Sequence, residues 1–180
     1  VAMAADHLPI MSPVVKWAAR VPTTSQIPEY IEMAWRHMWS GTPGPVFLEI
    51  PTDVLSAPTE AARPARFTRS QAGMTKDAST GLKEALQKAS RPLFILGNEL
   101  HWDNPAHLTK TIETIGAPFV TMRLARGIID ERHDLCAGPG YLPCNESLQT
   151  TLEETDLIVM IGHHFEFDIG FGSTIGPKAK

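Results

Sequence analysis

The chain has 180 residues, of which 16 are Lys or Arg and 20 are Asp or Glu, and its formal net charge is −4. This mild acidity argues against a nucleic-acid or anionic-membrane partner. With 43% hydrophobic and 20% charged residues, the composition is that of a globular protein and excludes disorder and collagen. The longest apolar runs, 92–97 and 157–162, are far shorter than the ~20 residues that span a bilayer.

The ends of the chain and its cysteines give a prediction of location. The first residue is Val1, and residues 1–11 lack the basic start and apolar core of a signal peptide, so we expect a segment of a longer protein. Cys136 and Cys144 are too few for a disulfide scaffold, and their spacing is not that of a zinc ribbon. A cytoplasmic protein with two ordinary thiols is predicted.

The first unit, residues 1–55, contains a helical pattern. Apolar residues recur with helical spacing from Ile27 to Met38, which predicts an amphipathic helix. A hydroxyl among residues 23–25 is expected to cap its start, and Ser40 and Gly41 to end it. The apolar run that follows at 44–51, bounded by Gly and Pro, predicts a buried strand.

Residues 56–75 change to Ala, Pro, Arg, Thr and Ser without apolar periodicity, which is typical of a linker between domains. They carry Arg63, Arg66 and Arg69, which are compatible with a phosphate ligand, although spaced arginines usually solvate a linker or fix it to a neighbouring domain. We interpret this stretch as the boundary between two domains.

Residues 76–180 alternate helical stripes with apolar strands. Helical patterns are centred on 82–89, 108–115 and 146–154, and strands are expected at 92–97, 118–122 and 157–161. This alternation predicts an α/β fold with a Rossmann-like parallel sheet covered on both faces.

Ligands of such sheets bind at the carboxyl ends of the strands, so the loops after these strands are the candidate sites. They contain no Gly-x-Gly-x-x-Gly fingerprint and no phosphate loop, but Arg123 and Arg126 could hold a diphosphate. His163, His164, Glu166 and Asp168 superficially suggest a metal site. Successive side chains of an extended backbone point in opposite directions, so these four side chains do not converge, and we predict no metal site there.

Two longer strings carry a family resemblance. Residues 13–21 and 41–55, with Pro-Gly-Pro-Val and Ile-Pro-Thr-Asp-Val-Leu, resemble the end of the pyrimidine-binding domain of thiamine-diphosphate-dependent enzymes of the acetolactate synthase superfamily. Residues 90–97 through 156–162 resemble the central domain of these enzymes, a Rossmann-like domain of the NAD/FAD-binding (DHS-like) type.

Within this superfamily, residues 125–133 and 162–172 look more like the branch of 2-hydroxyacyl-CoA lyase, oxalyl-CoA decarboxylase and benzaldehyde lyase. Acetolactate synthases have Arg-Phe-Asp-Asp-Arg in the last segment, and their second Arg handles the keto-acid carboxylate. Asp168 stands at that position, and its negative charge would repel a carboxylate. The resemblance therefore implies a lyase, carboligase or decarboxylase of 2-keto or 2-hydroxyacyl compounds.

The resemblance also implies where cofactors are bound. The activating Glu and the Gly-Asp-Gly…Asn motif that holds Mg²⁺ and thiamine diphosphate fall outside residues 1–180, so no catalytic residue and no metal ligand is expected here. Relatives that bind FAD or ADP often have Arg before Pro-Gly-Pro-Val, where this chain has Thr42, and nucleotide binding is thus left open. The positions that match a nucleotide shelf are Arg123, Arg126, Gly127, Gly138 and Gly162.

The family habit of sharing the thiamine site between two subunits implies a homodimer or homotetramer for the parent enzyme and a small-molecule substrate. Three alternatives are left open: the large subunit of acetolactate synthase itself, a stand-alone module that binds FAD or ADP, and a structural domain whose nucleotide pocket is vestigial. Tight nucleotide binding by the purified chain would favour the module, and its absence would favour the structural domain.

Overall fold

The computed structural model describes residues 5–58, 67, 73–102 and 105–179. The chain forms two compact units, Val1–Gly73 and Met74–Lys180, which are considered separately below as unit 1 and unit 2.

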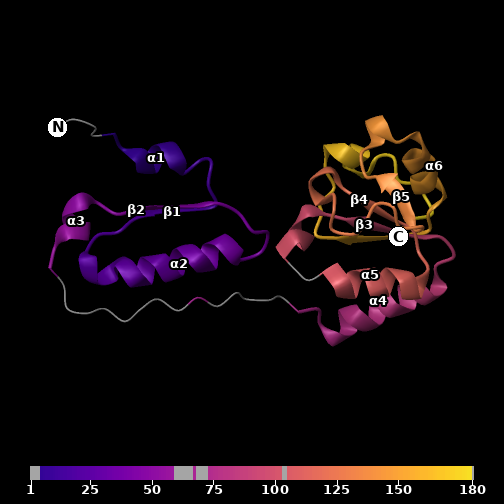
Figure 1. Ribbon diagram of the computed structural model, residues 1–180, viewed down its shortest axis with the longest axis horizontal. Helices are drawn as coiled ribbons and strands as arrows, with labels where there is room; N and C mark the ends of the chain where they lie inside the picture. Colours follow the sequence, from indigo (N-terminus) through magenta and orange to yellow (C-terminus); the bar gives the residue numbers. More distant parts are fainter. Residues whose placement is uncertain (1–4, 59–66, 68–72, 103–104, 180) are drawn as a thin grey trace. The chain divides into compact units, whose positions relative to one another are not determined.

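Unit 1 contains a pair of parallel strands with a long helix between them in sequence. Strands β1 (Trp17–Arg20) and β2 (Val46–Glu49) pair with Trp17 opposite Val46 and Arg20 opposite Glu49. Helix α2 (Ile27–Trp39) connects them and runs along the strand pair (Figure 1). Two short helices, α1 (His7–Met11) and α3 (Thr52–Ser56), flank this arrangement in sequence. The helix and the strand predicted here are confirmed by α2 and β2, but β2 is half-buried and not buried as predicted. Strand β1 was not predicted.

The start of α2 differs from the prediction. A 3-10 turn, η1 (Thr24–Gln26), leads directly into the helix, and the N-cap residue is Gln26, which makes no side-chain cap. The hydroxyl of Thr23 instead donates a hydrogen bond to Gln26 Oε1 at 2.8 Å. The predicted hydroxyl cap is therefore wrong, because the 3-10 turn already occupies the positions where a capping residue would stand. Ser40 follows the last residue of the helix, as predicted.

The predicted linker lies largely outside the described residues. Positions 59–66 and 68–72, which include Arg63, Arg66 and Arg69, are among the residues that the structure does not describe. Phe67 is described, and its ring lies 5.0 Å from that of Trp35 in α2. The interpretation of residues 56–75 as an interdomain linker stays a prediction.

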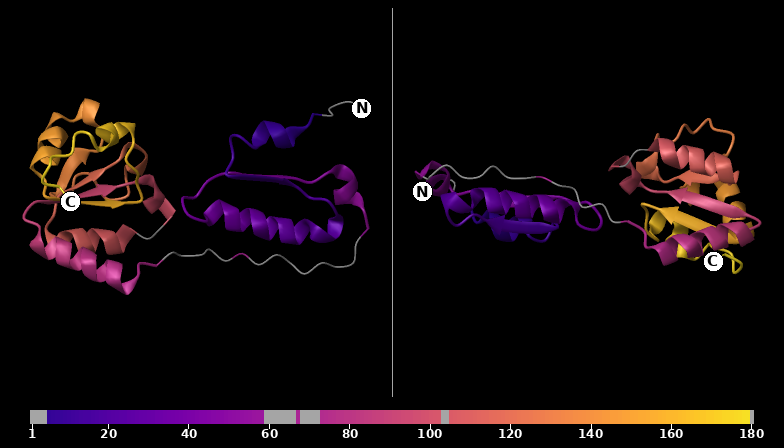
Figure 2. Two further views of the ribbon diagram at one scale, coloured as in Figure 1. Left: turned by 180° about the vertical axis from the view of Figure 1, so that it is seen from behind. Right: turned by 90° about the horizontal axis from the view of Figure 1, so that it is seen from below.

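Unit 2 is built around a four-stranded parallel sheet in the order β5-β4-β3-β6. Its strands are β3 (Pro92–Leu96), β4 (Phe119–Thr121), β5 (Cys136–Pro139) and β6 (Leu157–Ile161). Helices α4 (Lys76–Lys88) and α5 (Pro105–Ile115) lie along one face of the sheet, and α6 (Glu146–Glu154) lies on the other side (Figures 1 and 2). The predicted helices, three strands and parallel sheet are confirmed; β5 was not predicted as a strand.

Local sequence explains where the helices of unit 2 begin. The Thr75 hydroxyl accepts a hydrogen bond from the Ala78 N–H at the start of α4, and the Asn145 side chain accepts one from Leu148 at the start of α6. The strands are apolar because helices or loops cover both faces of the sheet, and residues 93–96 of β3 are all buried. Fully buried Phe119, Ile112, Leu148 and Leu152 join strands and helices into one core.

The strand order places a topological switch point next to β3. From β3 the chain crosses to β4 and β5 on one side, and it returns to pair β6 on the other side. The loops after β3 and β6 therefore leave the sheet side by side at its carboxyl end. The Gly97 N–H donates to the Ile161 carbonyl at 2.8 Å, and the Glu99 N–H donates to the Gly162 carbonyl at 3.2 Å. Ligand sites of open α/β sheets are found at such points.

Candidate functional site

The candidate site is the carboxyl edge of the unit 2 sheet, which we define as the loops 97–102, 122–127, 140–142 and 162–172. Arg123 lies in the 3-10 turn η3 (Arg123–Ala125) after β4, and Arg126 and Gly127 follow that turn. Gly162 directly follows β6, whereas Gly138 lies within β5. The structure thus brings four of the five predicted shelf residues to this edge and places the fifth in the neighbouring edge strand.

The glycines at the switch point are needed because two loops approach each other closely. A Cβ on Gly97 would lie 1.9 Å from the Gly162 carbonyl oxygen and 2.5 Å from the His163 Cβ. Gly162 itself has a φ of +65°, and a Cβ there would lie 3.0 Å from the Glu99 Cβ. Protein atoms fill the space beside both glycines, so these residues serve the packing of the loops.

Gly127 and Gly138 differ in their surroundings, although both have positive φ. A Cβ on Gly138 would meet the Asn145 side-chain nitrogen at 3.1 Å, while no atom lies within 4 Å of one on Gly127. Asn145 Nδ2 also donates hydrogen bonds to the carbonyls of Ala137 and Pro139. Of these two glycines, only Gly127 has open space beside it.

Arg126 is held by a carboxylate of its own loop. Its Nε and Nη2 donate to the two Glu131 oxygens at 3.0 and 2.5 Å, and the Thr121 hydroxyl also donates to Glu131 at 3.0 Å. The Arg126 guanidinium, together with the Thr121 hydroxyl, lowers the pKa of Glu131. The Glu131 carboxylate in turn raises the pKa of Arg126. The bidentate contact leaves this arginine neutralised.

Arg123 is held more loosely. Its Nη2 lies 3.4 Å from Asp168 Oδ1, and its guanidinium carbon lies 5.8 Å from the centre of the Tyr141 ring. The Arg123 side chain is 64% exposed, whereas that of Asp168 is 4% exposed. A buried carboxylate therefore faces an exposed cation across the edge.

Three buried polar atoms in these loops have no hydrogen-bond partner: Glu99 Oε1, His163 Nε2 and Asp168 Oδ1. Glu99 Oε1 lies 3.4 Å from His164 Nε2, and His163 Nε2 lies 3.5 Å from Glu166 Oε1. Asp168 Oδ1 lies 3.4 Å from Arg123 Nη2. Burial lowers the pKa of His163, and the nearby Glu166 carboxylate partly opposes this effect. Such concentrations of unsatisfied groups are typical of sites with a function beyond packing.

The two adjacent histidines lie in different surroundings. The His163 side chain is 2% exposed and that of His164 is 66% exposed. Among the described residues, no three His, Cys, Asp or Glu side chains are placed so that they could hold a metal ion.

Sequence reasoning identified the arginines but missed their carboxylate partners. Glu131 lies in a loop whose apolar residues have no helix or strand periodicity. Asp168 follows β6, whereas its partner Arg123 follows β4. Helical periodicity could not have revealed either pair, because the contacts depend on loop conformation and on the order of the strands.

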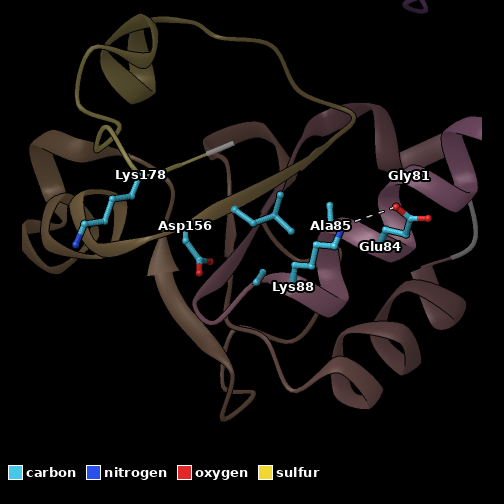
Figure 3. A pocket seen from close by; sticks show the side chains of 8 residues that line it. Gly81, Glu84, Ala85, Lys88, Asp156 and Lys178 are labelled. Carbon is cyan, nitrogen blue, oxygen red and sulfur yellow. Dashed lines mark ion pairs between the residues drawn. The ribbon is translucent and has the colours of Figure 1, made fainter.

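Two cavities of unit 2 lie at the opposite, amino end of the sheet. One cavity of about 370 Å³ lies between the start of β6 and α4, and Lys88 forms a 3.9 Å ion pair with Glu84 at its rim (Figure 3). Its Asp156 carboxylate accepts hydrogen bonds from the Ser90 and Arg91 backbone at 2.7 and 2.9 Å, which lower the pKa of Asp156. A second cavity of about 440 Å³ is lined by Arg91, Pro118 and Glu154, among others. None of the predicted shelf residues lines either cavity.

The parallel sheet with a switch point next to β3 defines a Rossmann-like α/β class of domain. Residues 80–179 match the family model described as thiamine pyrophosphate enzyme, central domain. This match covers more than half of the chain, and the chain belongs to that family.

Known proteins agree with this assignment. The chain is 28% identical to acetolactate synthase isozyme 1 large subunit of Escherichia coli and 24% identical to 2-hydroxyacyl-CoA lyase 2 of Caenorhabditis elegans, over 97% of its own length in both comparisons. It covers 32% of each of those proteins, so it spans about a third of the length of the curated relatives it matches.

A solved structure has the same fold. It is that of a protein from Mycobacterium smegmatis described as a thiamin diphosphate-dependent enzyme, with a TM-score of 0.66 at 22% identity. The match covers 97% of this chain and 34% of that one. Among the described residues, no helix is both long and apolar enough to cross a membrane.

Proposed function

We propose that the chain is part of a thiamine-diphosphate-dependent C–C lyase, carboligase or decarboxylase that acts on 2-keto or 2-hydroxyacyl compounds. The observation that carries this proposal is that relatives named acetolactate synthase and relatives named 2-hydroxyacyl-CoA lyase both align along nearly the whole chain. The large subunit of acetolactate synthase is the second candidate. Asp168 disfavours it, because a buried carboxylate opposes the binding of a keto-acid carboxylate.

In this proposal the chain itself is a scaffold and not the catalytic centre. Residues 1–55 are the end of the pyrimidine-binding domain, 56–75 the linker, and 76–180 most of the central domain. The described residues offer no cluster suited to Mg²⁺, and the sequence has no Gly-Asp-Gly string. Thiamine diphosphate, when bound, supplies the electron sink for the carbanion, and we assign it and Mg²⁺ to other parts of the parent enzyme.

The contribution of unit 2 is a ligand shelf at the carboxyl edge, formed by Arg123, Arg126, Gly127 and Gly162 with Gly138 beside it. The diphosphate of FAD or ADP is a poor fit to this shelf, because both arginines already face carboxylates and two of the glycines are packed against protein atoms. Arg123 is the better placed of the two for a ligand, since much of its side chain is exposed.

The test is to recover the coding DNA on both sides of this segment and to assay the full product. With thiamine diphosphate and Mg²⁺, we expect cleavage of a 2-hydroxyacyl-CoA or decarboxylation of a 2-keto compound, and little acetolactate from pyruvate. The segment 1–180 alone, given the same cofactors, is the control and should be inactive. Activity of that segment would contradict its role as a scaffold, and rapid acetolactate formation by the full product would favour the second candidate.

The parent enzyme is proposed to be a cytoplasmic homodimer or homotetramer with a small-molecule substrate. Light scattering of the full product gives its subunit number. A monomeric full product that is active would contradict a thiamine site shared between subunits.

A further inference from the structure

Every arginine in the stretch from Arg123 to Arg132 faces a carboxylate. Arg126 is bound to Glu131, and Arg132 donates from Nη2 to Asp130 at 2.8 Å. The Arg132 guanidinium lowers the pKa of Asp130 to about 2. Both pairs form between residues close in sequence within one loop, so they are local contacts.

The pair of Arg123 with Asp168 is different, because it joins two strand ends across the switch point. Asp168 lies in the 3-10 segment η5 (Phe167–Gly172) after β6, and its carboxylate is nearly inaccessible. The 3.4 Å contact does not satisfy Asp168 Oδ1 as a hydrogen bond, and the Arg123 side chain is mostly exposed. The carboxylate is therefore the fixed partner, and the guanidinium can exchange one acceptor for another.

The charges around this pair oppose an anionic ligand. Once the three arginine pairs are set aside, the Glu99 and Glu166 carboxylates remain on the edge. Within the described part of the chain, the ion-pair partner of each is an imidazole. A diphosphate group that approached Arg123 would have to replace Asp168 while this buried carboxylate stayed within about 4 Å. Like charges at such a distance repel by several kcal/mol at a protein surface.

We propose that Asp168 is a specificity-determining residue of the carboxyl edge: its buried negative charge beside the Arg123 guanidinium excludes diphosphate groups in favour of uncharged ligands. This inference rests on the carboxyl edge being the ligand shelf of the proposed function. It extends the role of Asp168 from repelling a keto-acid carboxylate to keeping a diphosphate group away from Arg123.

The experiment measures binding of inorganic pyrophosphate and of ADP to the full chain, 1–180, by calorimetry at low ionic strength. For the unaltered chain we expect no saturable binding below about 1 mM. The D168N variant keeps the shape of the side chain, removes its charge and releases Arg123, and it should bind pyrophosphate at least about 10-fold more tightly. The double variant D168N with R123Q should lose this gain.

The matched control is E166Q, which removes a carboxylate from the same loop but leaves the contact of Asp168 with Arg123 in place. It should change pyrophosphate binding far less than D168N does. Far-UV circular dichroism checks the fold of each variant, and D168S is a second neutral replacement if D168N does not fold.

Micromolar binding of ADP or pyrophosphate by the unaltered chain overturns the inference, and so does a folded neutral variant that gains nothing. An equal gain in E166Q would also overturn it, because the effect would then be one of net charge alone. These outcomes are distinct from failure of the proposed function, since a catalytic assay of the full product decides that question whether or not pyrophosphate binds.

Discussion

The two units of this chain use the same kinds of element but bury very different amounts of apolar surface. In unit 2, β3 is paired on both sides, and seventeen buried apolar residues form one core cluster. In unit 1, two parallel strands and α2 leave only Val21 and Ala34 as buried apolar residues among those described. Parallel strands depend on cover over both faces, and a two-stranded pair is marginal alone. Alternating βα patterns in a sequence therefore do not by themselves indicate equal stability.

The largest expected effect is a difference in hydrogen exchange between the two sheets. Amides of β3, β4 and β6 should exchange only through global unfolding of unit 2, whereas those of β1 and β2 should exchange through local opening. We expect the free energies of opening to differ by about 3–5 kcal/mol, since few buried contacts hold β1 and β2. Exchange of the full chain followed by NMR measures both sets in one sample.

The same contrast can be tested on the separated units. Residues 74–180 should unfold cooperatively in urea, and residues 1–73 should show no cooperative transition. Equal protection of the two sheets, or cooperative unfolding of 1–73 alone, would show that unit 1 has a core that its burial does not reveal.

A matched pair of leucines sharpens the comparison at single residues. Leu96 in β3 is completely buried, whereas Leu48 in β2 is half-buried. L96A should cost about 3–4 kcal/mol in the free energy of unfolding of unit 2, because a cavity forms in a close-packed core. Urea denaturation of the full chain measures this cost. L48A should cost about 1 kcal/mol or less in the free energy of opening of β1 and β2, as measured by hydrogen exchange of their amides in the same chain. Equal costs would place Leu48 in a comparable core.

The fold was largely predictable from the sequence because it follows from periodicity. The stripes at 27–38, 108–115 and 146–154 and the apolar run at 92–97 correspond to α2, α5, α6 and β3. The strands β1 and β5 escaped prediction because neither is a run of strand-forming residues: β1 contains two alanines and ends at Arg20, and β5 contains Gly138 and Pro139. Such short strands are defined by their pairing partners and not by their own composition.

The site was predictable only in its location. The carboxyl ends of parallel strands indicated the loops that hold Arg123 and Arg126. The sequence could not indicate that Asp168 would be buried opposite Arg123, because that contact arises from the order of β4 and β6 in the sheet and from the conformation of η5. Loop contacts of this kind carry no periodic signal.

A pair of glycines tests how rigid the switch point is within the stable unit. G97A places a Cβ against the Gly162 carbonyl oxygen and should cost at least about 2 kcal/mol, because backbone atoms must move apart. Gly81 lies inside α4 with no atom within 4 Å of an added Cβ, so G81A should stabilise unit 2 by about 0.5–1 kcal/mol through helix propensity. Thermal unfolding of both variants measures the expected loss of stability in G97A and the expected gain in G81A. A G97A variant of unchanged stability would show that the loops after β3 and β6 can separate at little cost.

The smallest expected effect concerns the pH dependence of unit 2 through His163. Burial keeps this imidazole neutral in the folded state and lowers its pKa, although the nearby Glu166, Asp168 and Glu99 carboxylates act in the opposite direction and His164 adds to the lowering. In the unfolded chain a histidine takes up a proton near pH 6.5. Below that pH, down to the lowered pKa of His163, the unfolded state binds more protons, and the free energy of unfolding falls as the pH falls.

H163Q removes this titration, so the variant should lose less stability than the unaltered chain between pH 7 and pH 5 in urea denaturation. H164Q is the matched control, because its imidazole is exposed and keeps most of its solvent on folding. The pH dependence of H164Q should stay closer to that of the unaltered chain than the pH dependence of H163Q does. If the free energy of unfolding of H163Q and of H164Q had the same slope against pH, protonation of His163 would not be coupled to folding. The Glu166 carboxylate would then have to offset the loss of solvent around the His163 imidazole.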